Sequence, residues 1–120
     1  MKTNHGKDPM DKDISKVKRN LRKLLRSQPL AVLATQNQGQ PYASLVAFAS
    51  SDDLKSLYFA TTRSTRKYAN LSGDSRVAML VDNRSNNTSD FRLAMAATAT
   101  VTAVEVYPRE RERALNRYLE

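Results

Sequence analysis

The sequence predicts a mainly β protein with peripheral helices (α+β), in which the strands form a small antiparallel barrel. Short apolar, β-compatible runs alternate with polar turn segments through the middle of the chain, which is typical of strands joined by hairpins. Helical periodicity is confined to the start, the end and one short insertion. A length of 120 residues suits a single domain with a modest core. We therefore expect one barrel domain flanked by helices.

The first helix is predicted from an apolar repeat. Residues 1–12 are polar and irregular, and we expect a flexible tail there. From Asp13, which can cap a helix, apolar residues recur at helical spacing until Pro29 stops the pattern. These apolar positions are Ile14, Val17, Leu21, Leu24 and Leu25, with Lys and Arg between them. The segment is an amphipathic helix in a domain that we place at residues 13–120.

The remaining elements follow from changes of period. Strands are predicted at residues 30–36, 41–50 and 57–62, with a turn centred on Gly39. A short helix follows at residues 64–71, with Gly73 at its C-terminal cap. A fourth strand covers residues 76–83, and β-branched residues predict a long fifth strand over 91–106. Pro108 then suits the first turn of a last helix.

Five strands closing on themselves leave the barrel wall incomplete. We expect either a further strand that this chain lacks, so that the barrel is C-terminally truncated, or an unusually short member of its class. A partner chain would also cover the gap.

Composition excludes several function classes. The chain has no cysteine and one histidine, so it offers no thiolate metal site, and we expect no metal. It has no apolar run of about 20 residues, so we expect no membrane partner and a cytoplasmic location. Residues 1–26 hold nine Lys/Arg against three Asp, a balance of +6, whereas residues 27–120 hold eleven Lys/Arg against nine Asp/Glu, a balance of +2. The excess charge therefore belongs to the first helix and the tail.

Three cationic residues cluster at the connection between the third predicted strand and the short helix. The sequence TTRSTRKYANL places Arg63, Arg66 and Lys67 there, although a helix N-terminus disfavours each cation by about 0.3–1 kcal/mol. A bound anion would reverse that penalty, since free helix N–H groups, hydroxyls, a guanidinium and an ammonium together suit a phosphate monoester. A solvent-exposed turn with a Ser/Thr cap is the alternative that the spacing leaves open.

These motifs resemble the pyridoxamine 5′-phosphate oxidase-like, FMN-binding split-barrel family. The segment LYFATTRSTRKYANLSGDSRVAML is similar to the strand, Ser-Arg-Lys, helix and strand series of that family, with Thr65, Arg66 and Lys67 at the Ser-Arg-Lys positions. LAVLATQNQGQPYASLVAF resembles its first hairpin. The resemblance implies a split β-barrel and a homodimer with FMN at the subunit interface.

The resemblance also implies the residues that bind FMN. Thr61, Thr62, Arg66 and Lys67 would hold or surround the phosphate, with Thr65 capping the helix or assisting. Ser44, Leu45 and Val46 would border the flavin ring or the ribityl chain, and Arg92 falls near a polar FMN contact of the family. An FMN-dependent oxidoreductase is the function we expect, with no catalytic residue or substrate specified.

Two departures argue against oxidation of pyridoxamine phosphate itself. Ser44 stands where a true pyridoxamine phosphate oxidase has Arg, and Ala49 stands where it has Lys. Branches of the same superfamily handle haem or the deazaflavin F420, which leaves both as alternative cofactors. Haem iron wants an axial ligand, and His5 is the one imidazole.

Nucleic-acid binding is the competing function class. The +6 segment favours it, and the aromatic residues Tyr42, Tyr58, Phe59 and Tyr68 could stack on bases. Core packing explains aromatic residues on predicted strands better, so we expect flavin rather than nucleic acid.

Overall fold

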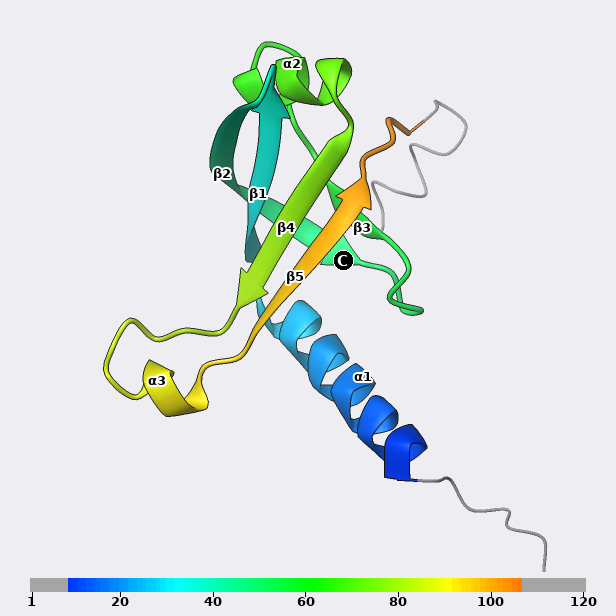
Figure 1. The fold of residues 1–120 in the computed structure, drawn as a ribbon, viewed down its shortest axis with the longest axis vertical. Coiled ribbons are helices and arrows are strands. Elements are labelled where there is room, and N and C mark those ends of the chain that lie inside the picture. The colour runs from blue at the N-terminus through cyan, green and yellow to red at the C-terminus, as the bar shows by residue number, and fades with distance from the viewer. Residues whose placement is uncertain (1–8, 107–120) are drawn as a thin grey trace, which may run out of the picture.

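The computed structural model describes residues 9–106, which form five strands and three helices (Figure 1). Their order along the chain is α1 (Pro9–Ser27), β1 (Leu30–Asn37), β2 (Gln40–Ser50), β3 (Leu57–Phe59), α2 (Arg66–Gly73), β4 (Arg76–Asp82), α3 (Asp90–Leu93) and β5 (Ala96–Thr102). No helix in this part of the chain combines the length and the apolar character needed to cross a bilayer.

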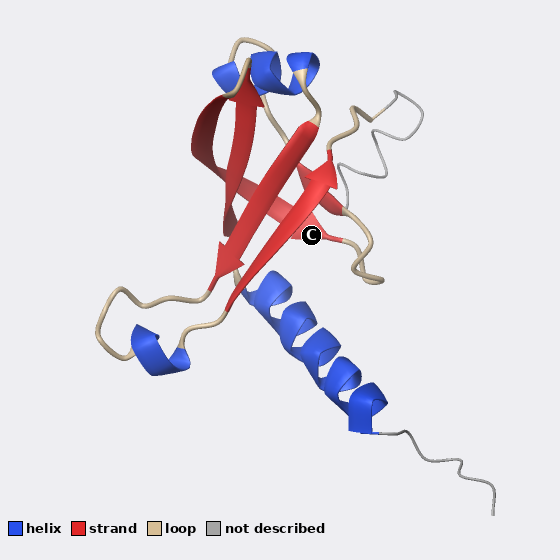
Figure 2. Ribbon diagram, viewed as in Figure 1, coloured by secondary structure: helices blue, strands red, loops and turns tan. Residues whose placement is uncertain are grey.

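The strands form one curled antiparallel sheet in the order β3-β2-β1-β4-β5 (Figure 2). The β1–β2 hairpin turns through Gln38 and Gly39, whose φ values of 51° and 83° fit a two-residue turn of matching twist. The register places Leu33 of β1 opposite Ser44 of β2 on one side and opposite Met79 of β4 on the other. The sheet is the five-stranded half-barrel of a split-barrel fold, as predicted.

One face of this sheet carries the core. Leu33 is fully buried and Met79 is 2% exposed, and every second residue of β1 and β4 faces the same way. Leu24 and Leu25, in the last turns of α1, pack into this cluster. Burial of such a side chain contributes about 1.5–3 kcal/mol, so this face fixes the register of the central strands.

α1 begins earlier than predicted. It starts at Pro9 rather than at Asp13, so the predicted tail over residues 1–12 overlaps its first turn. Proline is tolerated at the first helical position. The carboxylate of Asp11 in the first turn stabilises the helix by interacting with the positive end of its dipole. The helix therefore extends to Pro9 without needing Asp13 as a cap.

The cap predicted at Gly73 is also wrong. Gly73 is the last residue of α2, and Asp74 follows as the cap in extended conformation, with its N–H donating to the carbonyl of Asn70 at 2.9 Å. No left-handed residue is needed, because the chain turns directly into β4.

The long strand predicted over residues 91–106 is the largest error. Arg92 lies in the short helix α3, and β5 begins at Ala96. The carboxylate of Asp90 accepts the N–H groups of Ser85 and Asn86 at 2.7 and 2.6 Å, which closes a compact loop. The ladder resumes only after the Asn83 side chain accepts the Met95 N–H at 2.6 Å. The last predicted helix lies outside the described residues, and the third strand ends at Phe59 rather than at residue 62.

Candidate functional site

The connection from β3 to α2 brings three of the predicted threonines together. Thr65 is the N-cap of α2: its hydroxyl accepts the Tyr68 N–H at 3.2 Å and donates to the carbonyl of Thr62 at 2.8 Å. The Thr61 hydroxyl lies 2.8 Å from the Thr65 hydroxyl oxygen. Since a hydroxyl has one hydrogen, Thr61 donates in that pair, and Thr65 is occupied as a structural cap.

Donors for an anion remain at the first turn of α2. No described group accepts a hydrogen bond from the backbone N–H of Arg66 or Lys67. The first N–H groups of a helix have no partner within the helix and point outward. The site therefore presents two backbone donors next to two cationic side chains.

The cations at this corner differ in what they contact. Arg63 already pairs with Glu105 at 3.4 Å, and its guanidinium carbon lies 6.0 Å from the centre of the Tyr68 ring. Arg66 is exposed, with its guanidinium carbon 5.4 Å from the Tyr42 ring centre. Within residues 9–106 neither Arg66 nor Lys67 has a carboxylate partner. Their charge is therefore available to a ligand.

A buried hydrogen bond positions α2 against the sheet. The Asn70 side chain donates to the Thr35 hydroxyl at 3.0 Å, and both residues are only 3% exposed. A lone polar group in this place would cost about 1–3 kcal/mol, so the two residues fix one another. This pair could not be predicted from the sequence, because neither an Asn in a helix nor a Thr in a strand indicates its partner.

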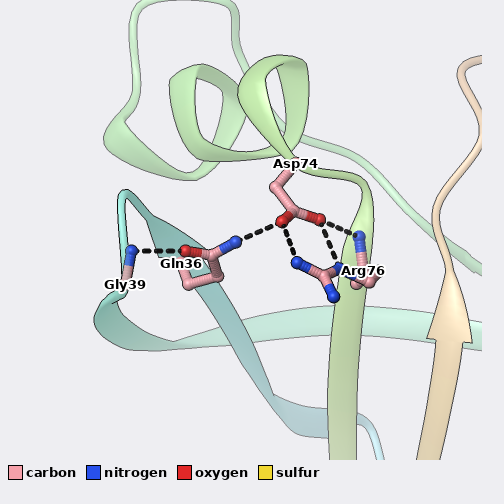
Figure 3. Close-up of polar contacts among 4 residues, drawn as sticks. All are labelled: Gln36, Gly39, Asp74 and Arg76. Atoms are coloured by element: carbon pink, nitrogen blue, oxygen red, sulfur yellow. Dashed lines mark hydrogen bonds and ion pairs between the residues drawn. The ribbon is translucent and has the colours of Figure 1, made fainter.

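A second set of polar contacts ties the far end of α2 to the first hairpin (Figure 3). Gln36 accepts the Gly39 N–H at 2.8 Å and donates to the Asp74 carboxylate. Arg76 approaches both Asp74 oxygens, with Nε at 3.0 Å from one and Nη2 at 2.6 Å from the other. The Arg76 hydrogen bonds hold the pKa of Asp74 well below its usual range, and Asp74 in turn raises the pKa of Arg76.

The β2 residues predicted to border the flavin lie on opposite faces of the strand. Ser44 and Val46 face the core side, which Tyr42 also faces, whereas Leu45 points to the outer side and is 62% exposed. The Ser44 hydroxyl is buried, and no described group forms a hydrogen bond with it. Val46 is 5% exposed within the core cluster.

Arg92 does not join the other predicted residues within one chain. It lies on α3, which links the end of β4 to the start of β5, and α2 lies at the opposite end of the sheet (Figure 1). Among the described residues there is also no cluster of His, Cys, Asp or Glu that could hold a metal ion.

Comparison with known protein families bears on this geometry. The family model described as pyridoxamine 5′-phosphate oxidase matches residues 17–119, which includes the whole sheet and the β3–α2 corner. The chain belongs to the pyridoxamine 5′-phosphate oxidase-like family. No curated protein matches the sequence.

Solved structures agree with the split-barrel fold of this family. A heme binding protein from Mycobacterium smegmatis matches with a TM-score of 0.70 and 19% identity, over 82% of this chain and 40% of that one. A protein of unknown function from Agrobacterium tumefaciens matches with a TM-score of 0.74 and 19% identity, over 99% of this chain and 48% of that one. This chain thus spans less than half the length of either protein.

A third similar structure is that of a FAD-binding protein. A FAD-binding protein from Mesorhizobium loti matches with a TM-score of 0.65 and 18% identity, over 85% of this chain and 72% of that one. At these identities the similarity shows that this chain shares the fold of these proteins. The ligand named for each of them is a property of that protein alone.

Proposed function

We propose that the chain is an FMN-binding flavoprotein that serves as an oxidoreductase, with the FMN phosphate at the start of α2. One observation carries this proposal: among the described residues, the backbone N–H groups of Arg66 and Lys67 have no acceptor, and their cationic side chains have no carboxylate partner. Membership of a family that includes flavin oxidoreductases supports it.

The donor set suits a phosphate dianion better than a neutral ligand. The α2 dipole and two backbone N–H groups favour negative charge, and the guanidinium can bind two phosphate oxygens at once. The Tyr42 ring lies against the Arg66 guanidinium, which limits the positions the side chain can take before a ligand arrives. Thr65 contributes by capping the helix. The Thr62 and Ser64 hydroxyls lie 3.4 Å apart, and since only one of them donates in that contact, the hydrogen of the other can be donated to a ligand.

The flavin ring would extend from this phosphate along β2. The unsatisfied Ser44 hydroxyl is the group we expect to hydrogen-bond the ribityl chain or a ring carbonyl. When bound, FMN supplies hydride or electron transfer, and the protein supplies binding and orientation. Because Ser44 and Ala49 carry no charge, the substrate is expected to differ from pyridoxamine phosphate.

A homodimer would complete this site. The outer face of the sheet is apolar at its centre, where Leu45 is flanked across the register by Val32, which in turn pairs with Leu80. A second copy over this face would bury Leu45. Arg92, remote from α2 in its own chain, would then reach a flavin only across such an interface.

Titration with FMN tests the phosphate site. Replacing Arg66 and Lys67 together by Ala removes two charged hydrogen bonds, so FMN affinity should fall by about 2–5 kcal/mol, measured by quenching of flavin fluorescence. The Lys16→Ala/Lys18→Ala variant removes the same charge from exposed positions of α1 and should bind as the wild type does. Equal losses in the two variants would show that diffuse charge, rather than a local site, attracts the cofactor.

Haem is the second candidate, favoured by the heme binding protein among the structural neighbours. It would need an axial ligand, and His5, the one histidine, lies outside the described residues. F420 carries a phosphate that would suit the same corner. The absorption spectrum of the purified protein, titrated with each cofactor, separates flavin from deazaflavin and from haem.

A further inference from the structure

The positive charge of the described chain is concentrated on α1. Residues 9–27 hold seven Lys/Arg and two Asp, a balance of +5, whereas residues 28–106 hold seven Lys/Arg and six Asp/Glu, a balance of +1. Only the last turns of α1 pack into the core, and the rest of the helix extends away from the sheet (Figure 1). A charged element in this position is accessible to a large partner.

Four of these cations form one surface, which we call the basic face of α1. Its members border a shallow, open hollow together with Ser27, and they are Arg19, Arg22, Lys23 and Arg26. Spacings of three, four and seven residues keep them on one side of the helix, over about 10 Å of its length. Only Arg26 has an ion-pair partner among the described residues: it pairs with Asp52 at 3.3 Å, and both side chains are largely exposed. An exposed pair of this kind contributes little and opens easily.

A second copy of the chain is a poor partner for this face. Every acidic side chain in residues 28–106 already has a cation, hydroxyl or backbone N–H as its partner. These partners are Arg26 for Asp52, Ser51 for Asp53, Arg76 for Asp74, Arg84 for Asp82, Ser85 for Asp90 and Arg63 for Glu105. The described part of the chain thus has no spare negative patch to neutralise the face.

A lipid surface does not suit the arrangement of apolar and basic side chains on α1. The exposed apolar side chains of α1, Ile14 and Val17, belong to the stripe that enters the core at Leu24. That stripe is about 200° around the helix from the basic face, as the two-residue step from Leu21 to Lys23 illustrates. Placing the stripe on a membrane would bring the barrel against it and turn the cations away.

We propose that the basic face of α1 binds the phosphate backbone of a nucleic-acid duplex. A duplex carries one negative charge per 1.7 Å of its axis, so the length of the face spans about six charges, enough for all four cations to engage. The proposed contact is with phosphates and involves no base stacking, because α1 carries no aromatic side chain and Tyr42 and Tyr68 already contact arginines in the barrel. This surface is separate from the β3–α2 corner, so flavin and duplex binding are independent.

Fluorescence anisotropy with a labelled duplex of about 20 base pairs tests this proposal, with DNA and RNA duplexes of one sequence as separate arms. Four phosphate contacts predict that affinity falls about 100-fold between 50 and 200 mM salt. In the Arg22→Gln/Lys23→Gln variant this fall should shrink to about 10-fold, with weaker binding at low salt. Either duplex binding in this way supports the proposal, and the tighter one identifies the natural source of the phosphates.

Lys55→Gln/Arg84→Gln is the matched control, since it removes the same charge from exposed residues outside α1. It should bind like the wild type, and circular dichroism melts should coincide for all three proteins. Equal weakening by the two variants would overturn the proposal, as would failure of the wild type to bind either duplex at 50 mM salt. Binding to phosphatidylserine vesicles but to neither duplex would also overturn it, in favour of a membrane.

Discussion

At the scale of single residues, what distinguishes the β3–α2 corner is which groups remain unsatisfied. Thr65 is occupied as a cap and Arg63 is occupied by Glu105, which leaves Arg66, Lys67 and the Ser44 hydroxyl. The Thr-Arg-Lys series could be recognised in the sequence, because its chemistry is local. The state of the Ser44 hydroxyl could not, because it depends on what the strands on either side place around it.

Replacing Ser44 by Ala should raise the stability of the cofactor-free protein and lower its affinity for FMN. A buried hydroxyl without a partner costs about 1–3 kcal/mol, so Ser44→Ala should raise the free energy of unfolding of the cofactor-free protein by about 1–2 kcal/mol. The same change should weaken FMN about 2-fold to 12-fold by removing one hydrogen bond. Urea denaturation and FMN titration measure the two effects, with Thr88→Ala in the exposed loop before α3 as a neutral control. A variant that loses stability and keeps full FMN affinity would contradict this role.

At the scale of elements, the site depends on how α2 is held. The Asn70–Thr35 hydrogen bond fixes its middle against β1, and the Asp74 contacts fix its end against the first hairpin. Strand positions could be predicted well, because apolar alternation in β1 and β4 is a period that sequence displays directly. The α3 loop could not, because hydrogen bonds from Asp90 and Asn83 outweigh the β propensity of the residues that follow.

The Asp74 contacts predict a dependence of stability on pH. The pKa of this carboxyl is lowered in the folded protein, so between that value and the ordinary pKa of about 3.9 the unfolded chain binds more protons. Its contribution to stability is complete above about pH 5 and is lost as the pH falls towards the folded pKa. Urea denaturation at pH 7 and pH 3 should therefore show a smaller difference in Asp74→Asn than in the wild type.

Two comparisons sharpen this measurement. Arg76→Gln should flatten the same pH dependence, because it removes the main cause of the shift. Some dependence should persist in both variants, since hydrogen bonds also lower the pKa values of Asp53 and Asp90. An unchanged difference between pH 7 and pH 3 in Asp74→Asn would mean that the carboxylate is not held in this way in solution.

At the scale of the whole molecule, five strands make a half-barrel with an apolar outer face. The antiparallel pairing of the first three strands was predictable from their short connections, and the incomplete barrel from the number of strands. The pairing of β1 with β4 was not predictable in this way, because β2, β3 and α2 lie between them in the sequence. Which residue sits at the centre of the outer face required the register, because a shift of one residue would have placed Leu45 in the core.

Leu45 provides the test of the proposed dimer. Burial of a leucine from each of two copies contributes about 3–6 kcal/mol, so Leu45→Lys should weaken self-association about 100-fold to 10,000-fold. Light scattering across a concentration series with FMN present should then report a monomer. Val17→Lys, which alters a 63% exposed valine on α1, is the control and should leave the dimer intact. A dimer that survives Leu45→Lys would place the interface elsewhere.

The central claim is that a phosphate binds at the first turn of α2, and calorimetric titration of the wild-type protein with FMN and with riboflavin tests it most directly. The two ligands share the ring and the ribityl chain and differ only in the phosphate. Two charged hydrogen bonds at about 1.5–3 kcal/mol each predict that FMN binds at least about 100-fold more tightly. Equal affinities, or no binding of FMN, would contradict the account.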